Sequence, residues 1–576
     1  MKRFVTLFCT LSLIFSCGGG KEDVTPVAEE LGVPTNVKLH SATESSLTFQ
    51  WSAVEGAKTY KWLLTKDGEK VKEGSVTSRN VTVDALTRGT VYMFSVCAVA
   101  GDKSSAYSDP VEARTEGEAP QPGAVVQCTD APLVVEVGSG AHLGTSGLIQ
   151  VFKENGTLVD KIDLADIANV TILDDGTMVP KATINGESTF HTFMDALHST
   201  RYRPVHYTPL RLKGGKLSIK LHNEALDFDG SYYLTMDESV VGKAIGKDDM
   251  PFSTKSAPSG TTLSVKADGS GDFCTVQGAL SYATALGKDT AVTIEIGDGT
   301  YNELLYLRDK NNLTIKGASR TGVVIAYPNN ESYATGSGSA SNSKPSFGSA
   351  VGVMGGRCLF LVESCNELVI ENLTIENTFN TSDHKGQAET IYFNGDSKKL
   401  TIGNCSLISW QDTFLCKGYV YVHDSLIAGH CDYIWGYPRA CLFENCEIRS
   451  RAAGYIVQAR VPGANDKGFV FLNCTLTAES GVADGSMYLA RSGGDTSVYD
   501  NVTFISCTMG PVIAPAGWHT GKTPTPSTPT ATSGWKEYAS VKPDGSSATS
   551  GRNSYGRILT ASEAEPYSSR AAVLGW

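Results

Sequence analysis

The stretch CLFENCEI, from Cys441 to Ile448, decides the fold, because close variants of it recur along the C-terminal half of the chain. Each variant has two short apolar runs joined at a polar residue, which is typical of two short β-strands that meet at a bend. The other copies are LVIENLTI (368–375), LTIGNCSL (400–407), VYVHDSLI (420–427), FVFLNCTL (469–476) and VTFISCTM (502–509), with NNLTIKG (311–317) as an earlier relative.

The spacing of these copies indicates a solenoid. Steps of 32, 20, 21, 28 and 33 residues separate the equivalent positions Leu373, Cys405, Ser425, Cys446, Cys474 and Cys507. A fixed local pattern at irregular spacing is typical of coils that share a cross-section and differ in loop length. Since no helical pattern lies between the strands, the sequence predicts a parallel β-helix, with small residues of one phase stacked inside as a ladder. We expect buried thiols in that ladder, and neither a disulfide framework nor a Cys/His metal site.

Two aspartates share one phase of the repeat. Asp412 follows Cys405 by seven residues, and Asp432 follows Ser425 by seven. Equal offsets on adjacent coils predict that the two carboxylates face each other, with backbones about 5 Å apart. Two carboxylates at that distance cannot both ionise freely, so the pair is expected to divide into an acid and a base or nucleophile.

The surroundings of the pair distinguish catalysis from the alternative, a ladder of like acids on a solvated face. Amide, aromatic and cationic side chains accompany the two aspartates, namely Gln411, Trp410, Tyr433, Trp435 and Arg491. This company favours a catalytic site.

The first residues predict export. Residues 1–16 (MKRFVTLFCTLSLIFS) have two basic residues and then a short apolar run, which is typical of a signal peptide. The run stops at Cys17, and IFSC resembles the lipobox of bacterial lipoproteins, whose cysteine carries the lipid; an ordinary signal peptide cut near Ser16 is the alternative. Residues 17–31 would be a tether. We expect an outer-membrane lipoprotein, at the cell surface or in the periplasm of a Gram-negative bacterium, that contacts the membrane only through its lipid.

The net charge of the chain limits the kinds of partner that it is expected to bind. The formal net charge of −12 argues against nucleic acid or an anionic membrane surface as a partner, and an uncharged substrate is easier to approach.

Residues 32–116 alternate apolar and polar residues and resemble a fibronectin type III domain, with Trp51 and with Leu86 followed six residues on by Tyr92 at the tyrosine corner. An immunoglobulin-like β-sandwich is expected over 122–256 and the solenoid over 258–576, in a monomer.

Seven further segments occur in order along the solenoid: ADGSGDFCTVQGAL (267–280), GTYNE (299–303), QAETIYF (387–393), WQDTF (410–414), DYIWG (432–436), YLARS (488–492) and PAGW (515–518). With them, residues 261–576 resemble the pectin methylesterases, carbohydrate esterases built on a right-handed parallel β-helix. The resemblance implies an all-β enzyme, with two sandwich modules ahead of the β-helix, that acts on methyl-esterified pectin (homogalacturonan).

The resemblance also implies a mechanism without metal or cofactor. Asp432, ionised, would attack the ester carbonyl of a galacturonosyl residue, and Asp412, protonated, would donate to the departing methanol and then serve as base for the hydrolytic water. The amides of Gln387 and Gln411 would face the oxyanion. Arg491 would hold Asp432 charged and oriented.

Other positions bear on the substrate. Tyr433, Trp435 and Trp518 would shape or stack against the sugar chain, though each could equally be packing bulk. Ser492 and Gly493 stand where the family usually has Pro and Trp, and Glu389 stands where a small apolar residue is usual. These departures bear on affinity and substrate pattern more than on the chemistry.

Two alternatives remain open. A polysaccharide lyase on the same fold would use calcium held by clustered acids together with a basic residue, and the sequence shows no such cluster. A non-catalytic glycan-binding surface protein would suit the two leading modules, but binding alone needs no paired acids.

Overall fold

The structure is a computed structural model that describes residues 31–43, 45–87, 89–116, 125–164, 170–172, 178–180, 190–194, 202–206, 209–331, 336–338, 356–380, 384 and 386–576. The predicted signal peptide and Cys17 lie outside the described residues. The chain divides into two compact units, Met1–Ala119 and Pro120–Trp576. No helix in the described part of the chain is long and apolar enough to cross a membrane.

The first unit is a small β-sandwich whose alternating strands bury one face each. Trp51 is in its core, and the hydroxyl of Tyr92 accepts a hydrogen bond of 2.9 Å from the backbone N–H of Thr87, so the predicted tyrosine corner is present. The strands of the first sheet are β1 (Lys38–Ala42), β2 (Leu47–Gln50) and β5 (Asn80–Val83), and those of the second are β3 (Thr59–Lys66), β4 (Glu69–Val76), β6 (Val91–Ala100), β7 (Lys103–Ser104) and β8 (Val111–Arg114).

The second unit begins with another sandwich, made of two sheets around a separate apolar core. One sheet contains β10 (Leu133–Glu136), β18 (Lys216–Ile219) and β17 (Leu210–Lys213), and the other contains β12 (Leu158–Asp163), β11 (Leu148–Lys153), β19 (Ser231–Met236), β20 (Pro251–Thr254) and β9 (Val125–Gln127). Two hairpins, β13 (Val170–Ile172) with β14 (Met178–Pro180) and β15 (Phe190–Met194) with β16 (Tyr202–His206), and the short helix η2 (Glu238–Val240) complete it. This sandwich and the solenoid form one compact unit.

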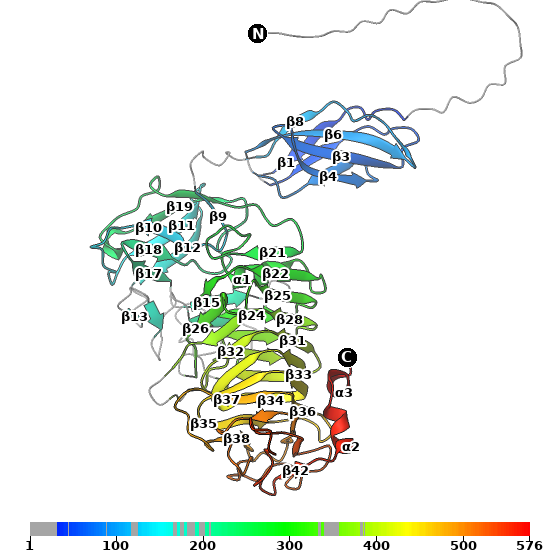
Figure 1. Ribbon diagram of the computed structural model, residues 1–576. Helices are drawn as coiled ribbons and strands as arrows, with labels where there is room; N and C mark the ends of the chain where they lie inside the picture. Colours follow the sequence, from blue (N-terminus) through cyan, green and yellow to red (C-terminus); the bar gives the residue numbers. More distant parts are fainter. Residues whose placement is uncertain are drawn as a thin grey trace, which may run out of the picture. The chain divides into compact units, whose positions relative to one another are not determined.

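The rest of the second unit is a parallel β-helix, as predicted (Figure 1), and its parallel pairings arrange the strands in three sheets. The first sheet contains β21 (Thr262–Val265), β22 (Val292–Ile296), β25 (Leu313–Gly317), β28 (Leu368–Glu371), β31 (Lys399–Gly403), β36 (Gly468–Leu472), β39 (Val502–Ile505), β41 (Trp535–Tyr538) and β42 (Gly556–Ile558). The second contains β23 (Gly299–Tyr301), β26 (Val323–Tyr327), β29 (Thr374–Asn377), β32 (Ser406–Ile408), β37 (Thr475–Ala478) and β40 (Thr508–Met509). The third contains β24 (Leu305–Arg308), β27 (Phe360–Glu363), β30 (Ile391–Asn394) and β38 (Met487–Ala490). Three long strands, β33 (Phe414–His423), β34 (Leu426–Glu444) and β35 (Glu447–Ala459), turn the corner from one sheet to another.

The polar residue of each repeat has a specific backbone role. It adopts the left-handed conformation at the bend, with φ between 48° and 57° at Asn372, Asn404, Asp424, Asn445, Asn473 and Ser506. Asn and Asp tolerate this conformation better than most residues, because their short polar side chains bond locally. The bend therefore explains why the repeat requires Asn or a similar residue there.

The residue after each bend points inward and forms the predicted ladder. Cys405, Cys446, Cys474 and Cys507 are buried free thiols, as expected. Each thiol lies near a backbone carbonyl, as in the 3.3 Å contact of Cys474 Sγ with Phe443 O. Aromatic rings stack further inside, with centroids 4.8 Å apart for Phe443 and Phe471 and 4.4 Å apart for Phe471 and Phe504.

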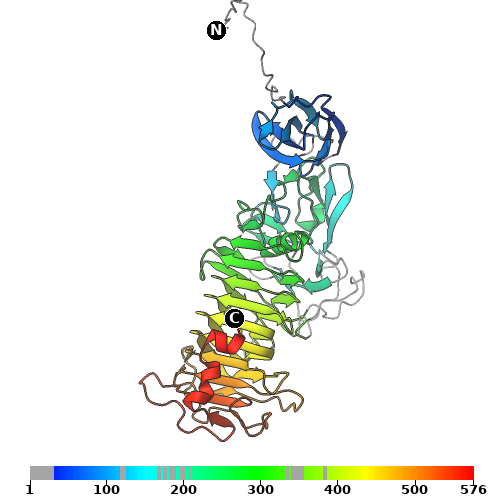
Figure 2. The same ribbon diagram turned by 90° about the vertical axis from the view of Figure 1, so that its right-hand side faces the viewer.

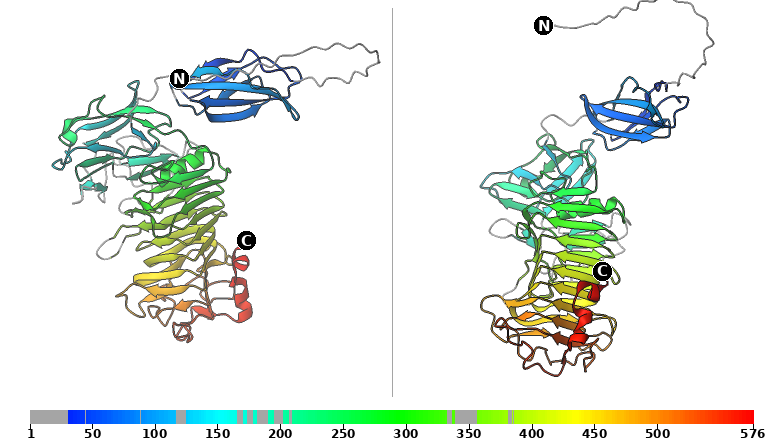
Figure 3. Two further views of the ribbon diagram at one scale, coloured as in Figure 1. Left: turned by 45° about the horizontal axis from the view of Figure 1, so that its top comes forward. Right: turned by 45° about the vertical axis from the view of Figure 1, so that its right-hand side comes forward.

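The second sandwich lies against the first coils of the solenoid (Figure 3), and polar side-chain contacts join the two. Arg203 of β16 is fully buried and donates to the backbone carbonyls of Leu305 (2.5 Å), Leu359 (3.1 Å) and Cys358 (2.6 Å). Asp130 accepts hydrogen bonds from Thr275 N and Oγ1, directly before helix α1 (Val276–Ala285). The module is therefore attached through a fully buried guanidinium and a half-buried carboxylate whose hydrogen bonds end in the solenoid.

The C-terminal segment packs against the outside of the solenoid (Figure 2). Its elements are α2 (Ala561–Ala564), η3 (Glu565–Tyr567) and α3 (Arg570–Leu574). Leu574 and Tyr567 join an apolar cluster with Tyr421 and Leu442 on the outer face of the first sheet.

Candidate active site

The two aspartates lie at one phase on neighbouring coils. The backbone of Gln411 pairs in parallel with Gln387 on one side and Cys431 on the other, which places Asp412 and Asp432 at equivalent positions. The predicted register is confirmed. Both residues are nearly buried, 3% and 4% exposed, and both adopt left-handed backbone conformations with φ of 65° and 48°. Such conformations are common at functional sites, where the surrounding structure holds them.

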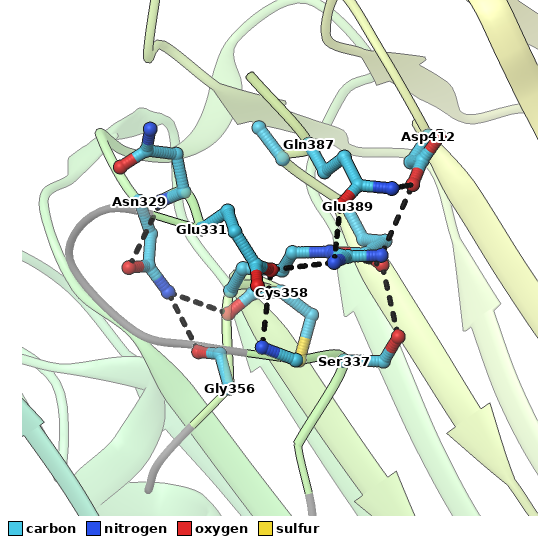
Figure 4. Close-up of polar contacts among 12 residues, drawn as sticks. Asn329, Glu331, Ser337, Gly356, Cys358, Gln387, Glu389 and Asp412 are labelled. Atoms are coloured by element: carbon cyan, nitrogen blue, oxygen red, sulfur yellow. Dashed lines mark hydrogen bonds and ion pairs between the residues drawn. The ribbon is translucent and has the colours of Figure 1, made fainter. Parts of the chain in front are cut away.

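Asp412 has a mixed environment that favours its neutral form. Its Oδ2 accepts hydrogen bonds from Arg357 Nη2 (3.1 Å) and Gln387 Nε2 (3.0 Å) (Figure 4). Burial raises the pKa of Asp412 well above its usual value, the negative charge of Glu389 raises it further, Arg357 opposes the shift, and Asp432 adds to it. Burial and neighbouring carboxylates therefore outweigh the single cation.

Arg357 connects several groups beneath Asp412. Its Nε donates to both oxygens of Glu389, at 2.9 and 3.0 Å, and its Nη1 donates to Glu331 Oε2 (2.5 Å) and Gln387 Oε1 (2.7 Å). Glu389 is fully buried, and burial raises the pKa of its carboxyl. Glu389 stands where the family usually has a small apolar residue, and the structure shows that it is the buried partner of Arg357. It also lies close enough to Asp412 to influence that carboxyl group.

Asp432 is surrounded by donors. Arg491 Nε donates to Oδ1 (2.8 Å) and Oδ2 (3.0 Å), Arg491 Nη2 also donates to Oδ2, and Gln458 Nε2 donates to Oδ2 at 3.0 Å. An ionised carboxylate only accepts hydrogen bonds, so this arrangement suits the charged form. The guanidinium of Arg491 also lies over the ring of Tyr455, 4.8 Å from its centroid.

The predicted aromatic residues are placed differently from one another. Tyr433 is 0% exposed and faces Ser450 inside the coil, and Trp518 is 1% exposed and stacks on Trp535 with ring centroids 5.3 Å apart. Both rings lack surface for a sugar, so their expected contact with substrate is corrected to a packing role. Trp435 is 7% exposed and remains beside the site.

Half-buried residues mark the side from which solvent reaches the pair. Gln387, Gln411 and Arg491 are all half-buried, and no hydrogen bond of the Gln411 side chain is found within the described residues. Next to Arg491, the half-buried rings of Tyr455 and Tyr488 lie with His519, whose ring centroid is 4.7 Å from that of Tyr455.

The departures after Arg491 leave an open space. Ser492 is buried and its hydroxyl donates to Asp500 Oδ2 at 2.9 Å. A Cβ added at Gly493 would meet nothing closer than the Gln458 amide at 4.0 Å. The missing aromatic side chain therefore leaves room directly above Gln458.

Other polar groups gather away from the pair. A cavity of about 570 Å³ lies between the second sandwich and α1, with Lys220 and Glu303 among its lining residues. Nearby, Cys128, Asp130 and Cys274 have possible metal-ligand atoms within 4.8 Å of one another. The Asp130 carboxylate already accepts hydrogen bonds from Cys274 N and from Thr275, so these atoms have a structural use.

Comparison with known proteins identifies the family. The family model described as pectinesterase matches residues 262–575, more than half of the chain. The chain belongs to the pectinesterase family. It is therefore a carboxylic ester hydrolase of the pectin methylesterase class. A fibronectin type III model matches residues 32–114. These matches support neither the lyase nor the glycan-binding alternative.

Curated relatives and solved structures are similar to this pectinesterase. "Pectinesterase 31" of Arabidopsis thaliana is 31% identical over 258 residues, 44% of this chain and 75% of the relative. "Probable pectinesterase A" of Aspergillus flavus is 32% identical over 277 residues, 47% and 77% of the two chains. Among solved structures, pectin methylesterase PemA from Erwinia chrysanthemi is 26% identical with a TM-score of 0.44 and covers 55% of this chain and 98% of its own.

Proposed function

We propose that this pectinesterase removes methyl groups from galacturonosyl esters of pectin through Asp432 as nucleophile and Asp412 as general acid and base. The observation that carries the assignment is the unequal environment of the two acids. The Asp432 carboxylate accepts hydrogen bonds from Arg491 and Gln458. Asp412, in contrast, shares its arginine, Arg357, with the carboxylates of Glu389 and Glu331. Such a difference separates an ionised from a neutral carboxyl group.

In the first step, an oxygen of ionised Asp432 bonds to the ester carbonyl carbon, and the carbonyl oxygen becomes an oxyanion. Amide N–H groups of Gln387 and Gln411 stabilise this charge. The C–O bond to the methoxy group then breaks, and the proton of Asp412 passes to the methoxy oxygen, which leaves as methanol. Asp432 is left joined to the galacturonosyl carbonyl as an anhydride.

In the second step, the ionised Asp412 takes a proton from water, and the water oxygen bonds to the anhydride carbonyl. The bond from that carbon to Asp432 breaks, which restores the Asp432 carboxylate and the protonated Asp412 and releases a galacturonosyl carboxyl group. Arg491 keeps the nucleophile oriented through its contacts to both oxygens.

The test is methanol release from highly methylated pectin by the purified full chain, without added metal. We expect release by the wild type, loss of at least about 1,000-fold for Asp432→Asn, and a reduction of about 100-fold or more for Asp412→Asn. Asp424→Asn is the matched control, because Asp424 lies on the same coil and has a left-handed φ of 50° but is exposed. Circular dichroism checks the fold. Ultraviolet-absorbing unsaturated products without methanol would favour a lyase, and retention on a pectin column with neither product would favour a binder.

We also propose that the chain is exported by residues 1–16 and anchored through a lipid on Cys17, as a monomer. The supporting observations are the basic start, the apolar run and the IFSC sequence. Metabolic labelling with palmitate should mark the wild type and fail for Cys17→Ala. Size-exclusion chromatography with light scattering of the soluble form should give the monomer mass.

A further inference from the structure

Gln387 is held at both ends of its amide. Arg357 Nη1 donates to Gln387 Oε1 at 2.7 Å, and Gln387 Nε2 donates to Asp412 Oδ2 at 3.0 Å. Glu389 in turn fixes the arginine through Nε. Glu389, Arg357 and Gln387 thus form a relay from a buried ion pair to Asp412, which Arg357 also reaches directly through Nη2 at 3.1 Å.

Gln458 is held in the same way on the other side of the pair. Arg460 donates to Gln458 Oε1 from Nη2 (2.6 Å) and Nε (3.2 Å), and Gln458 Nε2 donates to Asp432 Oδ2 at 3.0 Å. Arg460 Nη1 also donates to the hydroxyl of Tyr437 at 3.0 Å. In the described part of the chain, Arg460 forms no ion pair with a carboxylate.

The chemistry of the arginines decides which way each amide points. A guanidinium has only donors, so the amide atom that faces it must be the oxygen, and the nitrogen must face the carboxyl group. A flipped amide would place N–H against N–H at the arginine, and at Asp432 it would also place the amide oxygen against an ionised carboxylate. The arginines thus remove an ambiguity that an isolated glutamine would retain.

We infer that Arg357 and Arg460 are positioning residues that orient one amide toward each catalytic acid, an inference that rests on the proposed function. Each amide nitrogen has two hydrogens, and one is used on the aspartate. The second hydrogen of Gln387 is then directed to the space above Asp412, where the proposed oxyanion forms. Arg460 acts through Gln458 on the orientation of the nucleophile itself.

Trp435 joins the two relays. The guanidinium carbon of Arg460 lies 4.9 Å from the centroid of the Trp435 ring, and that of Arg357 lies 5.8 Å from it. Contact of a cation with an indole ring restricts a flexible side chain. One nearly buried ring thus helps to hold both arginines, which gives Trp435 a role that needs no contact with a sugar.

The first test is Arg460→Met, which keeps the bulk over Trp435 and leaves no buried carboxylate unpaired. We expect kcat for methanol release to fall about 10- to 100-fold with KM within about 2-fold, because only the alignment of reacting groups is lost. Arg460→Lys should recover part of the loss. The matched control is Arg451→Met: the Arg451 guanidinium lies over Trp410 at 4.0 Å but contacts Glu479 and the Ser409 carbonyl, and kcat should stay within about 2-fold.

The second test concerns Arg357, whose removal alone would leave the Glu389 carboxyl buried without its guanidinium partner. The double variant Arg357→Met with Glu389→Met removes both partners of the pair and keeps the volume. We expect kcat to fall about 10-fold or more at nearly unchanged KM, with the thermal midpoint kept within a few degrees.

The outcomes separate the two hypotheses. If the wild type releases no methanol, the proposed function fails. If the wild type is active but both relay variants keep wild-type kcat, or if KM rises while kcat is unchanged, the inference about the relays fails and the proposed function stands. A fall in kcat that Arg460→Lys does not reduce, accompanied by a lower thermal midpoint, would assign Arg460 a purely structural role and overturn the inference as well.

Discussion

Asp412 and Asp432 occupy equivalent positions on neighbouring coils, and each accepts one hydrogen bond of 3.0 Å from a glutamine amide. They differ in their arginines. Arg491 directs its donors at Asp432, whereas Arg357 divides its donors among Asp412 and two further carboxylates. The fold thus brings two aspartates together, and their different arginine contacts give the two carboxyl groups different electrostatic environments.

Replacing Glu389 should change the pH dependence of the reaction. The negative charge of Glu389 helps to raise the pKa of Asp412. In Glu389→Gln this contribution is lost, so the pKa of Asp412 falls and the acid loses its proton at lower pH. We expect the basic limb of the kcat profile to move down by about one pH unit. Glu331→Gln is the control: Glu331 also binds Arg357 but is half-exposed, so its shift should be smaller. An unmoved basic limb in Glu389→Gln would contradict the assignment of Asp412 as the acid.

An aromatic side chain at position 493 should strengthen substrate binding. A Cβ there would be 4.0 Å from the Gln458 amide, and the backbone of Gly493 is outside the left-handed region. We expect Gly493→Trp to lower KM for methylated pectin about 2- to 10-fold with little change in kcat, since a ring contact contributes about 0.5–1.5 kcal/mol. Gly494→Trp is the contrasting variant, because its φ of 75° strains any side chain. Its thermal midpoint should fall without a gain in affinity. A KM that stays constant or rises in Gly493→Trp would show that no sugar passes over this space.

Removing Arg203 should loosen the solenoid. Its guanidinium is fully buried and donates to the carbonyls of Leu305, Leu359 and Cys358. Arg203→Met removes these charge-assisted hydrogen bonds, while Leu359 O still accepts from Leu305 N and Cys358 O from Asn329 Nδ2, and we expect a cost of about 3 kcal/mol. We expect the thermal midpoint to fall by about 3 °C, measured by calorimetry, because the unit that unfolds is large. The exposed Arg211 of the same module is the control, and Arg211→Met should change the midpoint by less than about 2 °C. Equal midpoints for the two variants would mean that water replaces the guanidinium.

Lys536 should make stability depend on pH. It is fully buried in β41 and donates to Gly534 O at 2.8 Å, and burial lowers the pKa of its ammonium to about 7. The unfolded chain holds this proton up to about pH 10, so between about pH 7 and pH 10 the unfolded state binds more protons and stability rises with pH.

Lys536→Met removes this dependence. We expect the variant to be more stable than the wild type by about 3–5 kcal/mol at pH 6, with the difference fading toward pH 10. Denaturant titrations at several pH values measure it. A constant difference across the range would show that the lysine keeps its proton when folded.

Much of the fold was predictable because the repeat has a direct backbone cause. Asn404 and Asn445 mark left-handed bends, and the residues that follow them point inward, so a local pattern specifies each coil. The offset of seven residues predicted the register of Asp412 and Asp432 for the same reason. The family resemblance then supplied the candidate roles.

Other parts of the site could not be predicted, for two physical reasons. The pairing of β34 with β35 shifts register twice, between Gly429 and Cys431 and between Cys431 and Ile434, so counting from Cys446 does not reveal Gln458 as a neighbour of Asp432. In addition, a residue with a left-handed backbone, such as Asp432, interrupts the regular alternation of inward and outward side chains. The alternation therefore cannot be used to predict which way the next side chain points. Tyr433 therefore points into the core, against the expectation that it meets the sugar.

Arg357 was missed for a third reason. It lies in a stretch without a recognised motif, and its partner Glu389 was noted only as a departure from the family pattern. The two residues are 32 positions apart in the sequence and meet only because consecutive coils stack. A buried charge that looks out of place in one coil is a reason to search the preceding coil for its counter-ion.

The bonds from Arg203 and Asp130 across the module boundary determine what a minimal version of this enzyme can be. A gene trimmed to begin at the solenoid would encode a protein in which the carbonyls of Leu305 and Cys358 lose the Arg203 guanidinium, and in which Thr275, the N-cap of α1, loses the Asp130 carboxylate. Anyone shortening the protein for practical use should cut in the stretch before the second sandwich. In evolutionary terms, the middle module has to be inherited together with the catalyst.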